Sequence, residues 1–137
     1  MLDVGVWLAA VWVNHVHHPR VAAWFTEQDG DLCLCRVTQM GLLRLLSNAA
    51  VMSDDVVSRT DGCVVDRLRS DERMCWRQEP LQLEPVWRAM SARDDTGHKL
   101  STDDYPAAFA QAAGLPFVTL DTRFAPRYPS VTVHALL

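Results

Sequence analysis

Three aspartates carry the chemistry that this sequence suggests. Asp3 lies in the apolar segment 1–13, Asp103 lies where an alanine-rich helix is expected to begin, and Asp121 directly follows the apolar run Leu115–Leu120. Carboxylates that converge without a counterion repel one another, and at least one of them takes up a proton. Mg²⁺ and Mn²⁺ prefer oxygen ligands and resolve that conflict. Such an ion can position and acidify a water for attack on phosphorus. The three residues together predict metal-dependent phosphodiester hydrolysis.

Each aspartate also has an ordinary structural interpretation. An aspartate at a helix start is usually a cap, which is the simpler interpretation of Asp103 taken alone. An aspartate after a strand is usually a turn residue, and this applies to Asp121. Asp3 is harder to explain in this way, because a charge inside an apolar segment is costly unless it is paired or binds a metal.

The elements that position these residues alternate along the chain. We expect strands near Leu2–Val4, Leu32–Val37, Met74–Trp76, Leu115–Leu120 and Val131–His134. Between them the spacing of apolar residues predicts helices over Val6–Val13, Arg20–Gln28, Thr38–Ser47, Val56–Ser70, Glu84–Met90 and from Ser101–Asp104 to Ala113. Gly5 is the expected joint after the first strand, and Thr38, Asp54–Asp55 and Ser101–Asp104 are the expected helix caps. This order predicts an α/β fold around a mostly parallel sheet, in which ligands bind beyond the carboxyl ends of strands.

Composition narrows the class of protein. The chain has 137 residues, enough for a single domain over 1–137, and its 13 basic and 17 acidic side chains give a formal charge of −4. Such a charge opposes bulk electrostatic binding to nucleic acid, so contact with nucleic acid would need a local patch or a metal. Cys33 and Cys35 are expected in the core, and the cysteine spacing does not suggest a zinc site. No membrane span or leader is expected, which indicates a cytoplasmic protein with reduced thiols.

Four segments resemble the PIN-domain family, and specifically the VapC-type toxins of bacterial toxin–antitoxin pairs. They are LDVGVWLA at the start, NHVHHPRVAAWF (Asn14–Phe25), CRVTQMGLLRLLSN (Cys35–Asn48) and TDDYPAAFAQAAGLPFVTLDTRF (Thr102–Phe124). The resemblance covers nearly the whole chain. It implies a three-layer α/β/α sandwich with a central, mostly parallel sheet, an endoribonuclease activity that depends on Mg²⁺ or Mn²⁺, and inhibition by a VapB antitoxin.

The resemblance also implies roles for particular residues. Asp3, Asp103 and Asp121 match the family's acidic positions and would hold the metal, with Asp104 as an alternative to Asp103. Thr119 matches a small polar position near the site. Three positions depart from the family pattern: Gly41 stands where a glutamate is common, Gly5 where an asparagine is common, and Pro106 where an aliphatic residue is usual. The alternative function is therefore a PIN-fold protein with weakened catalysis that acts mainly through its antitoxin complex.

Further residues have possible roles in RNA or partner binding. The guanidinium groups suit phosphate geometry, and those of Arg123 and Arg127 are the best placed. Arg36 and Arg44 are further candidates, and tryptophans such as Trp76 and Trp87 could stack on bases. The histidines His15, His17 and His18 are most simply surface residues at a helix joint. Because Val6–Val13 is apolar around its whole circumference, we also expect a homodimer.

Overall fold

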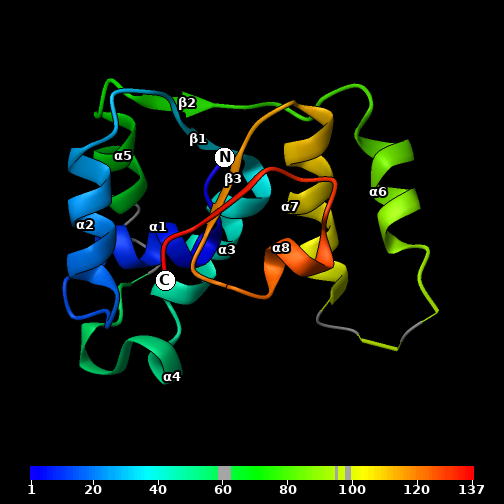
Figure 1. Cartoon of the computed structure of the whole chain (residues 1–137). Helices are drawn as coiled ribbons and strands as arrows, with labels where there is room; N and C mark the ends of the chain where they lie inside the picture. The colour runs from blue at the N-terminus through cyan, green and yellow to red at the C-terminus, as the bar shows by residue number, and fades with distance from the viewer. Residues whose placement is uncertain (59–62, 95, 98–99) are drawn as a thin grey trace. The chain divides into compact units, whose positions relative to one another are not determined.

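The computed structural model describes residues 1–58, 63–94, 96–97 and 100–137, and it alternates helices with strands (Figure 1). The elements are α1 (Val4–Val11), α2 (His18–Thr26), β1 (Leu32–Leu34), α3 (Arg36–Leu46), α4 (Ala49–Met52), the 3₁₀ helix η1 (Ser53–Asp55), α5 (Cys63–Arg69), β2 (Met74–Trp76), α6 (Leu83–Ser91), α7 (Leu100–Ala112), β3 (Phe117–Thr119), α8 (Phe124–Arg127) and β4 (Val133–Ala135). The predicted α/β class is confirmed.

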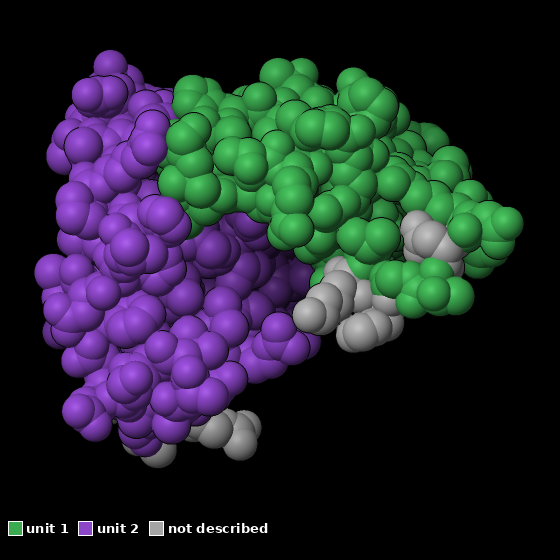
Figure 2. All heavy atoms as spheres, turned by 60° about the horizontal axis from the view of Figure 1, so that its bottom comes forward, with its two compact units in different colours: residues 1, 78–137 green, residues 2–77 purple. Residues whose placement is uncertain are grey.

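The chain forms two compact units, which Figure 2 colours separately. Unit 1 contains residue 1 and residues 78–137, and unit 2 contains residues 2–77. In the described part of the chain, the strands form two parallel pairs, β1 with β2 and β3 with β4. The predicted parallel pairing is therefore present, but a single central sheet is not formed by these short strands.

In unit 2, the strand β1 lies between β2 and the segment around Leu2. Leu32 donates its N–H to the carbonyl of Arg73, and the carbonyl of Leu34 accepts from Arg77, so these two residues bond toward β2. The carbonyl of Cys33 instead accepts from the N–H of Leu2. Backbone groups of successive strand residues point to opposite sides, which gives the order Leu2, β1, β2. Cys33 and Cys35 are each 2% exposed, which confirms their predicted place in the core.

The first helix begins two residues earlier than we predicted. Asp3 has extended backbone and its Oδ1 accepts a hydrogen bond of 2.7 Å from the N–H of Val4, so it is the N-cap of α1. Gly5 therefore lies inside the helix and is not a joint between a strand and a helix. The expected strand Leu2–Val4 is reduced to an isolated bridge at Leu2.

The start of α3 also differs from the prediction. Strand β1 ends at Leu34, and the N-cap is Cys35, three residues before the expected cap Thr38. The side chain of Thr38 instead hydrogen-bonds to the backbone of the cap residue. Its Oγ1 accepts from the N–H of Cys35 at 3.0 Å and donates to the Cys35 carbonyl at 2.9 Å. Thr38 can replace the usual glutamate of a capping box because its hydroxyl both donates and accepts.

Two further expected caps are wrong. Asp54 and Asp55 lie in η1 and do not cap α5, since residues 56–58 are irregular and the described part of α5 begins at Cys63. The expected residues 59–62 of that helix fall outside the described residues. The box Ser101–Asp104 lies within the first turns of α7, which already includes Leu100. Gly114 follows α7 with a φ of +64°, as its predicted role in helix termination requires.

Unit 1 is built on the pair β3 and β4 and on the packing of α6 against α7. Phe117, Val118 and Thr119 of β3 are all buried, and Phe117 stacks on Phe124 with ring centroids 4.4 Å apart. Pro106 lies inside α7 and is buried, so the helix accommodates the proline within its length. Asp121 lies two residues beyond the carboxyl end of β3, close to where the sequence predicted it.

Glycine 41 allows a close approach of α3 to α1. A Cβ at Gly41 would lie 2.8 Å from Cγ2 and 3.3 Å from Cγ1 of Val4, whereas a Cβ at Gly5 would meet nothing within 4 Å. The structure therefore leaves no room at position 41 for the glutamate that is common there. This contact also places Gly41 beside the residue that follows Asp3.

We expect Gly41→Ala to be less stable than Gly5→Ala by about 1–3 kcal/mol. Both changes gain about 1 kcal/mol of helix propensity, but only the methyl at position 41 is overpacked. Urea unfolding of the two variants measures the difference. Adding Val4→Ala to Gly41→Ala should restore most of the loss, and equal stability of the two single variants would contradict this packing.

Within the described residues, no helix has the length and apolar character needed to cross a membrane.

Candidate metal centre

Asp121 is held in place by its own turn. Its Oδ1 accepts from the backbone N–H of Arg123 at 2.9 Å and from Nε of Arg123 at 3.2 Å. The backbone hydrogen bond from Arg123 is the main cause that lowers the pKa of Asp121, and the charges of Arg123 and Arg127 lower it further. The carboxylate is therefore ionised near neutral pH, as a metal ligand needs to be.

Thr119 fixes the backbone that leads to Asp121. It is fully buried in β3, and its Oγ1 accepts from the N–H of Asp121 at 3.1 Å. The carbonyl of Thr119 accepts from the N–H of Leu136 at 3.0 Å, next to β4. Thr119 is thus a positioning residue, which holds Asp121, the second residue after the strand, in a defined place.

Asp103 lies in the first turn of α7 and pairs with an arginine. Its Oδ2 accepts from Nη1 of Arg127 at 2.8 Å, and its side chain is about two-fifths exposed. The guanidinium of Arg127, which is the last residue of α8, is mostly buried. Since the charge of Arg127 also lowers the pKa of Asp121, this one guanidinium lies in the field of both carboxylates. Both carboxylates lie in unit 1, and each is paired with its own arginine, Asp103 with Arg127 and Asp121 with Arg123.

Asp104 has a different environment from its neighbour. It is 5% exposed, and its Oδ1 accepts from the hydroxyl of Tyr128 at 2.7 Å. Burial, and then the hydrogen bond to Asp104, raise the pKa of Tyr128 well above its usual value, so the phenol stays protonated as the donor. This buried, hydrogen-bonded position favours a structural role for Asp104.

Asp3 belongs to unit 2, separately from the other two aspartates. Its side chain caps α1, and the residue is half-buried. Among the described residues, no group of three or more histidine, cysteine, aspartate or glutamate side chains lies close enough to hold a metal ion. The chemistry of the donors nevertheless suits Mg²⁺ or Mn²⁺, because these ions prefer oxygen ligands such as the carboxylates of Asp103 and Asp121.

The histidines do not supply a second donor set in the described residues. Nδ1 of His15 accepts from the N–H of His17 at 3.1 Å, and Nδ1 of His18 donates to the carbonyl of Ala9 at 2.7 Å. Burial, followed by the charges of His17 and His18, lowers the pKa of His15. The three residues lie at the joint between α1 and α2, as predicted, but they are half-buried and not fully exposed surface residues.

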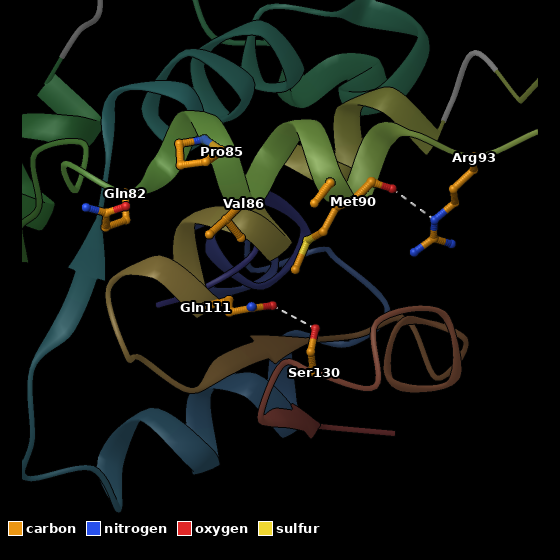
Figure 3. A pocket seen from close by; sticks show the side chains of 8 residues that line it. Gln82, Pro85, Val86, Met90, Arg93, Gln111 and Ser130 are labelled. Atoms are coloured by element: carbon orange, nitrogen blue, oxygen red, sulfur yellow. Dashed lines mark hydrogen bonds between the residues drawn. The ribbon is translucent and has the colours of Figure 1, made fainter.

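A cavity of about 510 Å³ opens in unit 1, beside α6 and α7 (Figure 3). Hydrogen bonds cross its lining from Ser130 to Gln111 at 2.7 Å and from Nε of Arg93 to the carbonyl of Met90 at 3.0 Å. The lining residues are Gln82, Pro85, Val86, Ala89, Met90, Arg93, Gln111 and Ser130. Because this lining contains no carboxylate, the cavity is not the predicted metal site.

Two residues of this site were not assigned these roles from the sequence. Tyr128 was missed, because its partner Asp104 lies 24 residues earlier and a tyrosine in a loop gives no local signal for this contact. Arg127 was expected to bind RNA phosphates, but the structure shows it bound to Asp103. The short spacing between Asp121 and the two arginines that follow it, Arg123 and Arg127, was the sequence signal available for such ion pairs.

Comparison with known proteins identifies the family to which this chain belongs. The model of the PIN domain matches residues 1–128, so the chain belongs to the PIN-domain family. Within that family it is a VapC-type ribonuclease. It is 36% identical over 131 residues to Ribonuclease VapC41 of Mycobacterium tuberculosis (strain ATCC 25618 / H37Rv), covering 90% of each chain. Ribonuclease VapC39 of the same strain is 30% identical, over 91% of this chain and 90% of the relative. Ribonuclease VapC29 is 29% identical, over 97% and 93%.

Proposed function

We propose that this VapC-type ribonuclease hydrolyses RNA phosphodiester bonds with Mg²⁺ or Mn²⁺ held by Asp3, Asp103 and Asp121. The observation that supports this most is that both carboxylates of unit 1 form ion pairs with arginines at the two ends of α8, Asp103 with Arg127 and Asp121 with Arg123. When bound, the metal ion supplies a water of lowered pKa and positive charge beside the scissile phosphate.

The chain's own residues orient the two carboxylates of unit 1. The N–H of Arg123 fixes the rotamer of Asp121, and Thr119 fixes its backbone. Arg127 binds Asp103, and Arg123 binds Asp121. The guanidiniums of these two arginines would also suit the phosphate oxygens of the substrate.

Metal removal tests the proposed function. The purified, antitoxin-free protein should cleave a single-stranded RNA in Mn²⁺ or Mg²⁺, and excess EDTA should abolish the cleavage. Adding the metal back should restore it. Equal cleavage with and without EDTA would mean that the reaction does not need the metal, and the assignment of the carboxylates would then be wrong.

The partners follow from the same family membership. We propose inhibition by a VapB-type antitoxin and assembly as a homodimer in the cytoplasm. Exposed apolar side chains in unit 2 support an interface: Val13 is 70% exposed, Val16 82% and Met40 62%. Val13 and Val16 lie in the same short segment between α1 and α2, where a contiguous apolar surface would suit a partner.

We also propose that residues 1–137 form a single PIN-like domain, a three-layer α/β/α sandwich around one central sheet. The match of the PIN-domain model to residues 1–128 supports this, because it covers most of the chain as one domain. A crystal structure would test the arrangement.

A further inference from the structure

One exposed tryptophan stands at the end of the strand pair in unit 2. Trp76 is the last residue of β2, pairs in register with Leu34, and is 37% exposed. The pair is parallel, so Trp76 lies at the carboxyl end of the strands, which is the edge where α/β proteins bind ligands. Because this large aromatic ring is partly exposed to solvent, it does not serve only to fill the core.

Two guanidiniums flank this ring. Cζ of Arg36 lies 4.5 Å from the ring centroid and Cζ of Arg69 lies 5.7 Å from it. Arg36 is the first residue of α3, directly beyond β1, and Arg69 is the last residue of α5. The cluster of Arg36, Arg69 and Trp76 therefore comes from three elements of one unit.

The charge of this cluster is not compensated by ion pairs in the part of the chain that the structure describes. The salt bridges found there involve other arginines, namely Arg73, Arg77, Arg88, Arg123 and Arg127. Nη1 of Arg36 donates instead to the neutral amide oxygen of Gln39 at 2.6 Å. Two positive charges thus gather on an aromatic surface in a chain whose formal charge is −4. Such a patch attracts an anion that also has a flat apolar face.

We propose that Trp76, Arg36 and Arg69 form a docking site for single-stranded RNA, in which a base stacks on the indole and the guanidiniums bind the flanking phosphates. Bases stack on aromatic rings with little dependence on sequence, and guanidinium binds phosphate oxygens in pairs. The choice of RNA as the ligand rests on the proposed function.

The position of the cluster suits a substrate that also reaches the candidate metal ligand of unit 2. Strand β1 lies between β2 and Leu2, and Asp3 follows Leu2 directly. In the direction perpendicular to the strands, Trp76 and Asp3 are therefore two strand spacings apart, which is about 10 Å. An extended strand of RNA can span that distance while one base stays stacked on Trp76. The cluster thus positions the substrate and takes no part in the reaction.

Binding of a short fluorescein-labelled oligouridylate tests the proposal. Fluorescence anisotropy is measured on the full-length protein in EDTA, so that no metal-dependent cleavage takes place. Trp76→Leu should weaken binding about tenfold, whereas Trp76→Phe keeps an aromatic face and should lose about threefold or less. Replacing Arg36 and Arg69 together by glutamine should also weaken binding and lower the slope of log K against log salt by about 1.4.

Arg88→Gln is the matched control, because Arg88 is exposed and already paired with Glu84. It should bind as the parent does. Thermal unfolding shows that each variant is folded. Parental affinity in both Trp76→Leu and the double arginine variant overturns the proposal. So does normal RNA binding combined with weaker binding of the antitoxin, which would assign the surface to a protein partner.

The two proposals fail in different ways. If the parent cleaves RNA and the variants bind it normally, the docking site is wrong and the proposed function stands. If the parent does not cleave RNA but binding still depends on Trp76, the docking site stands and the function is wrong.

Discussion

Asp121→Asn is expected to lower the rate of RNA cleavage at least about 100-fold, which corresponds to about 2.7 kcal/mol of transition-state stabilisation. Asparagine has nearly the same shape, and its amide oxygen can still accept the N–H of Arg123, which Asp121 binds at 2.9 Å. The turn after β3 therefore survives, while the negative charge that would hold the metal is lost. The measurement is the initial rate of cleavage of a labelled RNA in Mn²⁺.

Asp71→Asn is the matched control for this change. Oδ1 of Asp71 accepts from both the backbone N–H and Nε of Arg73 at 3.0 Å, as Asp121 does with Arg123. Arg73 holds the pKa of Asp71 at about 2, so this carboxylate is also ionised near neutral pH. Asp71→Asn should keep the parental cleavage rate per folded molecule. If both variants lose activity equally, the effect comes from the local turn and not from a metal ligand.

Tyr128→Phe is expected to lower the free energy of unfolding by about 2 kcal/mol, and the melting temperature by several degrees. Tyr128 is 1% exposed, and its hydroxyl donates to the buried Asp104 at 2.7 Å. Phenylalanine fills the same space but leaves the carboxylate without this donor. The loss is measured by urea unfolding, and it should come with an unchanged affinity for Mn²⁺.

The companion variant Asp104→Asn separates the two adjacent aspartates. The amide oxygen of asparagine still accepts from Tyr128, so the variant should stay folded and should bind Mn²⁺ as the parent does. Asp103→Asn should lose metal binding instead. The reverse result, with metal binding lost in Asp104→Asn and kept in Asp103→Asn, would make Asp104 the ligand.

The sequence predicts the order of the elements well, because buried strands are short apolar runs and each is followed by a helix with its own apolar spacing. It predicts helix starts less well. Cys35 and Thr38 can both act at a cap, and a charge inside an apolar run made Asp3 look like the end of a strand when it caps α1. Which of two nearby residues becomes the helix cap depends on backbone geometry, and local composition does not determine that geometry.

The sequence predicts where two of the aspartates lie in the fold but not what surrounds them, and their role as metal ligands stays a prediction. Asp121 follows β3, and Asp103 lies in the first turn of α7. The ion pair of Asp103 with Arg127 and the hydrogen bond of Asp104 with Tyr128 each span 24 residues, and such contacts leave no local pattern. Gly41 explains one departure from the family, since its hydrogen lets Val4 approach where a side chain would collide.

Calorimetric titration of Mn²⁺ into the metal-free, antitoxin-free protein tests the central claim most directly. We expect saturable binding at millimolar Mn²⁺ or below, which Asp121→Asn and Asp103→Asn each abolish and which Asp71→Asn leaves intact. An absence of binding by the parent protein, or binding by Asp121→Asn with parental affinity, would contradict the assignment of these carboxylates to a metal centre.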